Sequence, residues 1–255
     1  MTANDAVAYP LFKIAEAKSG KAESVGVTCA TCKVNTLCLP AGLSPQEFEH
    51  VEDGVAARIK VKRGDTLFQR GDRFKNLYVL RTGFVKSQIP QEDGQVRVTG
   101  FQMAGDALGL DAIADEVHTR ECVAIEDAEV CVRPYAMLER VARQVPSLQR
   151  HMHKSMSREI VREGGTLLLT AMHAERRVAT FLIDLSERLH ARGFSPTELV
   201  LRMSREEIGC AVGLKLETVS RTFSQFANAH IVAVQQRYVH ILNMQALRRL
   251  ANACE

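Results

Sequence analysis

The sequence predicts an α+β protein: an N-terminal β-roll, which is a small jelly roll of short strands, then one long helix and a C-terminal winged helix-turn-helix. Three observations support this order. Glycines separate short apolar alternations between residues 58 and 132, and a helical period without proline begins at residue 147. A capped helix, a glycine turn and a second helix then fill residues 204–229. The 255 residues suffice for one large domain or two ordinary ones.

Composition excludes several classes of protein. The chain is 46% hydrophobic and 25% charged, which excludes a mainly disordered protein. No apolar stretch approaches the length of a membrane span, and the first residues lack the basic start and apolar block of a signal peptide. We therefore expect a soluble cytoplasmic protein with no membrane partner. Its seven cysteines, an odd number, argue against a disulfide scaffold and favour metal ligands, a reactive thiol or core cysteines.

The net charge of +3 hides a division along the chain. Residues 146–255 carry 15 basic and 10 acidic side chains, whereas residues 1–145 carry 18 and 20. The basic C-terminal part is compatible with nucleic-acid binding, although the excess is small.

The chain divides into five predicted segments. They are a disordered segment at 1–28 with a short helix near 11–17, a cysteine-rich segment at 29–45, a β-roll at 46–145, a long helix at 146–175 and a winged helix-turn-helix at 176–255. Inside the second and third, Pro45–Ala57 is predicted as a helix with Ser44 as its N-cap. Six glycines separate the strands of the roll: Gly64, Gly71, Gly83, Gly94, Gly100 and Gly105.

The long helix carries one stripe at steps of three and four residues. Its members are Leu148, Met152, Met156, Ile160, Glu163, Leu167 and Thr170. Such a stripe favours a dimer seam of the coiled-coil kind, while a helix packed on its own domain stays an alternative. Glu163 would face its own copy in a two-fold seam and repel it. The alternative places Glu163 at the rim, solvated or paired with Arg162.

The helix-turn-helix begins at a capping box made by Ser204 and Glu207. Gly213 allows the sharp turn, and a second helix is predicted over residues 216–229. Its buried stripe is Val219, Phe223 and Phe226. A hairpin around residues 235–237 would form the wing.

Glu217, Ser220 and Arg221 lie opposite that stripe, near the start of the second helix. A recognition helix contacts base edges at this end. Arginine suits guanine O6 and N7, glutamate accepts from cytosine N4, and serine is permissive or packs on a thymine methyl. An ordinary helix pair with a solvated polar face is the alternative, which the capping box, turn and wing in this order disfavour.

Cys29, Cys32 and Cys38 are spaced C-x2-C-x5-C, which favours metal ligation over redox dithiol chemistry. Zinc or a [4Fe–4S] cluster needs a fourth thiolate. The remaining cysteines are candidates: Cys122, Cys131, Cys210 and Cys254. Cys131 faces out of the roll if Val130 and Val132 face in, Cys122 is as compatible with the core, Cys210 is expected in the core of the helix-turn-helix, and Cys254 is at the end of the chain.

Five segments together resemble the Crp/Fnr superfamily of bacterial transcription regulators, and specifically its fumarate and nitrate reduction regulator branch, which senses oxygen with an iron–sulfur cluster. They are CATCKVNTLC, RGDTLFQRGDRFKNLYVLRTGFVKS, TGFQMAGDALGLDAI, ERRVATFLIDLSERLHARGFSP and GLKLETVSR. The similarity extends from Cys29 to the end of the chain. It implies a β-roll of the cyclic-nucleotide-binding kind and a homodimer.

The resemblance implies a [4Fe–4S] cluster on Cys29, Cys32, Cys38 and Cys131, because the family's fourth ligand follows the third by the same 93 residues. The branch's recognition triplet matches Glu217, Ser220 and Arg221, which implies a TTGAT-like half-site in an inverted repeat. Loops such as Gln91–Gln95 would contact RNA polymerase, again by family resemblance.

Two positions depart from relatives. The nucleotide-binding branch has Gly-Glu-Leu and then Arg-Ser/Thr for the phosphate, where this chain has Gly105-Asp106-Ala107 and His118-Thr119. An aspartate without the arginine is a poor anion site, so we expect no cAMP binding. Lys33 follows Cys32 where the family has a small polar residue, with an effect on the cluster that the sequence does not determine.

The resulting hypothesis is an oxygen-responsive global transcription regulator, not an enzyme, in which the cluster promotes dimerisation under low oxygen. The alternative is a zinc-stabilised or cluster-free regulator of the same family, without oxygen sensing. A redox-dithiol enzyme is disfavoured because no substrate site accompanies the cysteines.

Overall fold

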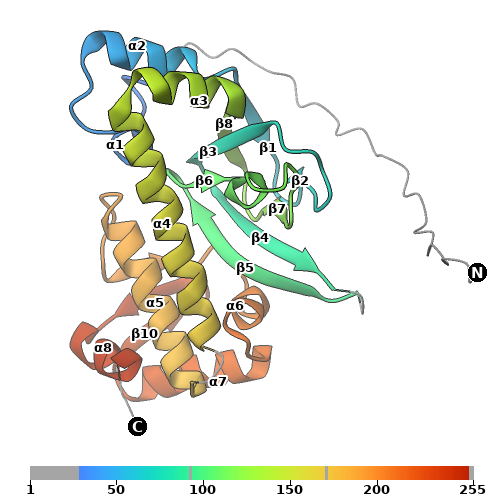
Figure 1. The fold of residues 1–255 in the computed structure, drawn as a ribbon. Coiled ribbons are helices and arrows are strands. Elements are labelled where there is room, and N and C mark those ends of the chain that lie inside the picture. The colour runs from blue at the N-terminus through green and yellow to red at the C-terminus, as the bar shows by residue number, and fades with distance from the viewer. Residues whose placement is uncertain (1–28, 92–93, 170–171, 253–255) are drawn as a thin grey trace, which may run out of the picture.

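The structure, a computed structural model, describes residues 29–91, 94–169 and 172–252 (Figure 1). The predicted disorder at 1–28, the helix near 11–17 and Cys254 lie outside these residues. The predicted α+β architecture is confirmed: a β-roll comes first, a long helix follows, and a smaller helical part with a three-stranded sheet ends the chain.

The β-roll consists of two four-stranded sheets, ordered β1-β8-β3-β6 and β2-β7-β4-β5, with antiparallel pairing throughout. Leu80, Cys122 and Val130 are fully buried between them. The strands are β1 Ala57–Val61, β2 Thr66–Phe68, β3 Asn76–Thr82, β4 Phe84–Pro90, β5 Val96–Met103, β6 Ala107–Leu108, β7 Glu121–Ala124 and β8 Ala128–Pro134, with a 3-10 turn at Leu110–Ala112.

Two short helices precede the roll: α1, Asn35–Cys38, and α2, Pro45–Asp53. Ser44 caps α2 as predicted, in a capping box with Glu47. The prediction that this helix reaches Ala57 is wrong. Gly54 ends it, and Ala57 pairs with Val132 as the first residue of β1.

Helix α3, Tyr135–Gln144, leads into α4, Pro146–Leu169, which runs from the roll to the C-terminal part (Figure 1). His173 has extended backbone and starts α5, Ala174–His190, so the helix predicted to continue through Ala174 ends earlier. Leu148 is buried, whereas Ile160 and Val161 are each 71% exposed. Among the described residues no helix is long and apolar enough to cross a membrane.

The C-terminal part packs α5 with the helix-turn-helix and the wing, and its sheet is ordered β10-β11-β9. Its core also includes Phe101 and Met103 of β5, so the two parts share one apolar cluster. Its remaining elements are β9 Glu198–Val200, α6 Arg205–Val212, α7 Leu216–Asn228, β10 Val232–Gln235, β11 Tyr238–Ile241 and α8 Met244–Asn252.

Candidate nucleic-acid interface and cysteine centre

The first helix of the helix-turn-helix, α6, begins as the sequence predicts. The Ser204 hydroxyl accepts from the Glu207 N–H at 3.1 Å, and the Glu207 carboxylate accepts from the Ser204 N–H at 2.8 Å. Burial alone would raise the Glu207 pKa, but the Ser204 N–H and the Lys86 ammonium hold it below its usual value. Gly213 ends α6 with a φ of +69°, a conformation that residues with a Cβ rarely adopt.

Arg177 of α5 stabilises the turn between α6 and α7. Its guanidinium donates to the carbonyls of Val212 at 3.2 Å and Gly213 at 2.9 Å. These carbonyls belong to the end of α6, where backbone acceptors have no helical partner. No local pattern in the sequence indicates this role of Arg177, because 35 positions separate it from the nearer carbonyl.

The second helix, α7, buries the predicted stripe: Val219, Phe223 and Phe226 are 0–3% exposed. Thr222 is also buried, and its hydroxyl donates to the Thr218 carbonyl. The Arg205 guanidinium lies 3.4 Å from the centre of the Phe223 ring, a cation–π contact that ties the start of α6 to α7. Burial lowers the Arg205 pKa to about 10, which leaves it charged at neutral pH.

Glu217, Ser220 and Arg221 are all exposed, on the first two turns of α7. The wing is a hairpin of β10 and β11, with Gln236 in left-handed backbone at its tip. Tyr238, beside the tip, is 62% exposed. A helix that presents polar side chains free of packing, flanked by a wing, fits the major groove of DNA.

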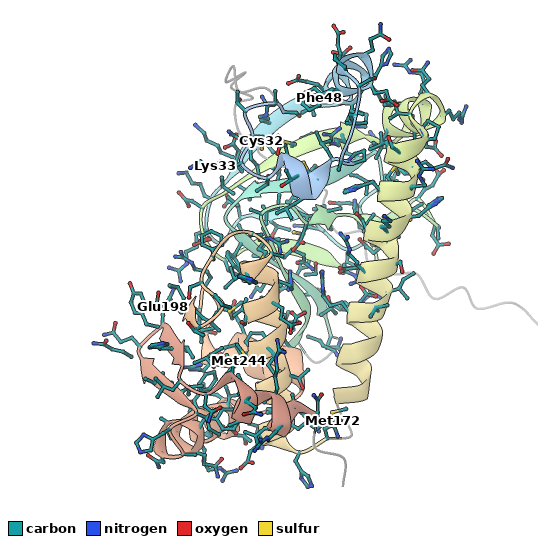
Figure 2. The ribbon with its side chains drawn as sticks, turned by 90° about the vertical axis from the view of Figure 1, so that its left-hand side faces the viewer. Cys32, Lys33, Phe48, Met172, Glu198 and Met244 are labelled. Atoms are coloured by element: carbon teal, nitrogen blue, oxygen red, sulfur yellow. The ribbon has the colours of Figure 1, made fainter. Side chains whose placement is uncertain are left out.

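The cysteine-rich segment folds back onto the outside of the β-roll, where Figure 2 shows Cys32 and Lys33. The Cys29 N–H donates to the Glu52 carboxylate of α2 at 2.6 Å. Cys29 and Cys131 are 5% and 8% exposed, and Cys32 and Cys38 are half-buried. Val130 faces the interior of the roll, so Cys131 lies on the opposite face of β8, as alternate strand residues do.

The four thiols lie close enough to affect one another's ionisation. Burial raises the pKa of Cys38 to about 12, and the charges of Cys32, Cys29 and Cys131 act in the same direction. Burial also raises the Cys29 pKa, with Arg133 as the principal opposing cation. Without a ligated metal these two thiols are therefore protonated at neutral pH, and metal binding must displace their protons.

The donor chemistry of this group fits an iron–sulfur cluster. Four soft sulfur donors converge where Arg133 lies near Cys29 and Cys38, and Arg81 lies near Cys32. Within the described part of the chain, no three His, Cys, Asp or Glu side chains are placed to hold one metal ion. Four thiolates would be a donor set for an iron–sulfur cluster or for zinc.

Two further cysteines have different positions. Cys122 is fully buried in the core of the roll, and burial raises its pKa strongly. Cys210, expected in the core of the helix-turn-helix, is instead half-buried at the contact between α6 and the roll. Its sulfur accepts from the Val98 N–H at 3.1 Å and donates to the Val96 carbonyl at 2.8 Å, so it joins α6 to β5.

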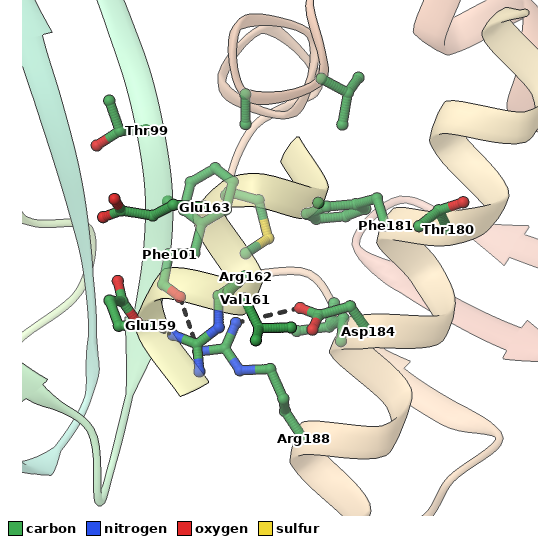
Figure 3. Close-up of a pocket in the computed structure, with 16 residues that line it drawn as sticks. Thr99, Phe101, Glu159, Val161, Arg162, Glu163, Thr180, Phe181, Asp184 and Arg188 are labelled. Carbon is green, nitrogen blue, oxygen red and sulfur yellow. Dashed lines mark hydrogen bonds and ion pairs between the residues drawn. The ribbon is translucent and has the colours of Figure 1, made fainter. Parts of the chain in front are cut away.

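Glu163 of α4 forms an ion pair with Arg120, 2.6 Å away. Arg162, the partner that the sequence alternative offered for a rim Glu163, forms an ion pair with Glu159 at 2.6 Å. Glu163 lines a cavity of about 290 Å³ between α4, β5 and α5 (Figure 3). Of the other seam residues, Met152 and Met156 are half-buried and Ile160 is exposed, while the Leu167 side chain lies outside the described ones.

Asp106, where nucleotide-binding relatives have glutamate, forms ion pairs with Arg188 at 2.7 Å and Arg192 at 2.6 Å. Burial alone would raise its pKa, but these two guanidinium groups hold the pKa below its usual range. Neither arginine was predicted as a partner of Asp106. The only local signal is their spacing of four residues, with Arg188 in the last turn of α5 and Arg192 just beyond its end.

A β-roll that shares a core with a winged helix-turn-helix, with an exposed polar face on the second helix, defines a DNA-binding transcription regulator rather than an enzyme. Family models agree: residues 58–145 match the cyclic nucleotide-binding domain, and residues 176–250 match the Crp-like helix-turn-helix domain. The chain belongs to the Crp/Fnr family of transcription regulators.

Several relatives cover most of the chain. Transcriptional regulatory protein btr of Bordetella pertussis is 42% identical over 87% of this chain and 92% of its own length. The fumarate and nitrate reduction regulatory protein of Escherichia coli is 37% identical over 88% of this chain and 90% of its own. The structure of FixK2 from Bradyrhizobium japonicum superposes with a TM-score of 0.71 at 28% identity, covering 78% of this chain and 98% of that one.

Proposed function

We propose that this chain is an oxygen-responsive global transcription regulator whose DNA binding depends on a [4Fe–4S] cluster. Cys29, Cys32, Cys38 and Cys131 would hold it. The observation that carries the proposal is the folding of the three clustered cysteines onto the face of β8 that presents Cys131. The 37% identity to a fumarate and nitrate reduction regulatory protein supports it.

When bound, the cluster supplies an oxygen-sensitive link between the cysteine-rich segment and the roll. The chain's own residues do the rest. With four thiolates ligated, α1 would stay packed against the roll. When ligation is lost, the bond from Cys29 to Glu52, the hydrogen bond of the Leu37 backbone with His151 and apolar contacts remain to hold the segment. A short segment at the surface opens at lower free-energy cost than the core.

DNA recognition would use the exposed face of α7. Arg221 would donate to guanine O6 and N7, Glu217 would accept from cytosine N4, and Ser220 would contact a neighbouring base. The proposed site is an inverted repeat of TTGAT-like half-sites, one for each protomer of a homodimer. A dimer doubles the contacts, so weakening it lowers DNA affinity.

The homodimer would form along α4, where Ile160 and Val161 are exposed apolar side chains with no cover in the described chain. The ion pair with Arg120 neutralises much of the Glu163 charge, so the repulsion between the two copies of Glu163 at the seam is weaker than the sequence alone suggests. Glu163→Ala should strengthen the dimer, and Arg120→Ala, which frees the carboxylate, should weaken it. If sedimentation shows equal dimerisation for both variants, Glu163 has no role at the seam.

Two further elements of the proposal concern partners. We propose that the chain does not bind cAMP, because Asp106 places a carboxylate in the turn that relatives use for the nucleotide and its two arginines are already occupied. Residues Gln91–Gln95, between β4 and β5, would contact RNA polymerase during transcription in the cytoplasm.

Anaerobic purification followed by iron, sulfide and zinc analysis, absorbance, sizing and operator binding tests the function. We expect four iron and four sulfide per chain, a brown dimer that binds the site, and loss of colour and binding in air. A colourless, air-stable dimer that binds its site would exclude the oxygen switch. Zinc in place of iron would indicate a zinc-stabilised regulator on the same thiolates.

A further inference from the structure

The turn between β5 and β6 touches both the cysteine-rich segment and the DNA-binding part. On one side the Leu37 side chain of α1 lies directly against Gly105: a Cβ added there would be 2.8 Å from the Leu37 Cβ. Gly105 also has a φ of +95°, which favours glycine on its own account. The contact is therefore closer than any other residue type would allow.

On the other side of the turn, the Asp106 carboxylate binds Arg188 of α5 and Arg192, which follows the end of that helix. Its two oxygens accept separately, one from Arg188 at 2.7 Å and one from Arg192 at 2.6 Å. The same arginines donate to the carbonyls of Phe101 at 2.8 Å and Ala104 at 2.6 Å. Two guanidinium groups, one on α5 and one just after it, thus fix the end of β5 and the Asp106 turn through four bonds.

Helix α5 carries this connection into the helix-turn-helix. Its Val178 and Leu182 are fully buried in the cluster that contains Val219 and Phe223 of α7. Arg177, on the same helix, holds the carbonyls at the end of α6. A shift of α5 relative to β5 therefore moves both helices of the DNA-binding motif.

We propose that the Gly105–Asp106 turn couples the cysteine-rich segment to α7 within one protomer, with Asp106 as the positioning residue and Leu37 as the contact that sets the turn. The contacts that form this coupling are present without a cluster. The coupling rests on the proposed function in one step: ligation of Cys38, the neighbour of Leu37, is the event that moves Leu37.

The burial of the ion pairs between Asp106 and the two arginines restricts motion of the turn relative to α5. The side chains of Asp106, Arg188 and Arg192 are only 10–13% exposed. Loss of the Asp106 carboxylate would remove the anion that both guanidinium groups share, although Arg188 would keep Asp184 and Arg192 would keep the Ala104 carbonyl. A small displacement at Leu37 would then change how often the two pairs open.

Hydrogen exchange on the full-length protein, with and without air, tests the coupling directly. In Leu37→Ala we expect the amides of Gly105 and Asp106, and those of α5 near Arg188, to exchange at least roughly threefold faster. Thr36→Ala, an exposed neighbour on α1, serves as the matched control and should leave α5 unchanged. Faster exchange confined to α1 in Leu37→Ala would overturn the proposal.

The positioning role of Asp106 is tested by Asp106→Asn and by Arg192→Gln, which keeps one of the two pairs. Glu187→Gln is the control, since it removes an exposed pair with Arg248 from the same helix. We expect operator affinity to fall about tenfold in Asp106→Asn and less in Arg192→Gln, with the dimer fraction and the folded fraction unchanged. A purely structural role would lower the folded fraction and leave the affinity of the folded dimer as it was.

A double-mutant cycle separates this proposal from the proposed function. Combining Leu37→Ala with Asp106→Asn should add little exchange at α5 beyond Asp106→Asn alone, because both act on one connection. Additive effects would contradict the coupling even in a protein that senses oxygen. If the effects are non-additive and the protein binds no iron, the coupling is supported and the oxygen switch is excluded.

Discussion

The helix-turn-helix and the cysteine-rich segment lie in different parts of the structure and obtain their conformations from different sources. Helix α6 has a complete capping box, a left-handed glycine at its end and a fully buried Ile208. Helix α1 has four residues, no side-chain cap and no fully buried residue. The first motif is specified by its own sequence, whereas the second depends on partners elsewhere in the chain.

This difference suits the two proposed roles. A recognition surface must keep its shape until it meets DNA, and local signals together with a dense core provide that. A segment that senses through a bound ligand, as we propose for the cysteine-rich one, would take most of its stability from the ligand rather than from its fold. The structure places the weakly supported segment where its Leu37 contacts the turn that leads to the strongly supported domain.

The largest expected effect concerns the four cysteines proposed to hold the cluster. Cys131→Ser should abolish cluster binding, because the fourth thiolate links the segment to β8 and serine oxygen is a poor substitute for it. Iron and sulfide analysis after anaerobic reconstitution measures the loss. Cys122→Ala, a buried cysteine of the roll's core, is the control and should retain four iron per chain despite lower stability. Full iron content in Cys131→Ser would mean that the segment takes its fourth ligand elsewhere.

The next effect concerns the densely packed part. Phe223→Ala removes a buried ring from the core of α7 and the aromatic partner of Arg205, and should destabilise the protein by about 3–5 kcal/mol. Phe194→Ala, a ring that is 61% exposed, should change stability by less than about 0.5 kcal/mol. Denaturant unfolding gives both values. Similar losses would show that the core does not specify the recognition helix.

The sequence predicts the helix-turn-helix better than the cysteine-rich segment. Ser204, Glu207, Gly213 and the buried stripe of α7 act within a few residues of one another, and periodicity and capping rules find them. Strand alternation indicates that Cys131 faces out of the roll, but only the spacing in the resembling family singles it out as the expected fourth ligand.

Contacts between the parts lay beyond any local signal. Asp106 and Arg192 are 86 residues apart, and Cys210 contacts backbone more than 110 residues away. Cys210 was expected in the core of the helix-turn-helix, and no local signal indicates that it meets the β-roll instead. The role of such a residue is therefore set by packing between elements, which sequence alone does not order.

A smaller effect concerns recognition without stability. Arg221→Ala removes an exposed side chain, so folding should be unchanged, while affinity for the operator falls by about 1–3 kcal/mol. The loss should disappear for operators altered at the guanine that Arg221 contacts. Arg248→Ala, exposed on α8, is the control. Equal losses on every sequence would assign Arg221 to the phosphate backbone instead of a base.

The smallest expected effect concerns the capping box, a hydrogen-bonded motif that occurs in both regions. Ser44 and Ser204 form the same capping box, so replacing either with alanine should cost about 1 kcal/mol of stability. Their consequences should differ, because α2 also holds the Cys29 N–H through Glu52, whereas α6 contacts no ligand cysteine. Ser44→Ala should therefore speed the loss of cluster absorbance under limiting oxygen, and Ser204→Ala should leave that rate unchanged. If both variants lose the cluster equally fast, its retention follows global stability and the segment is no more independent than the rest of the fold.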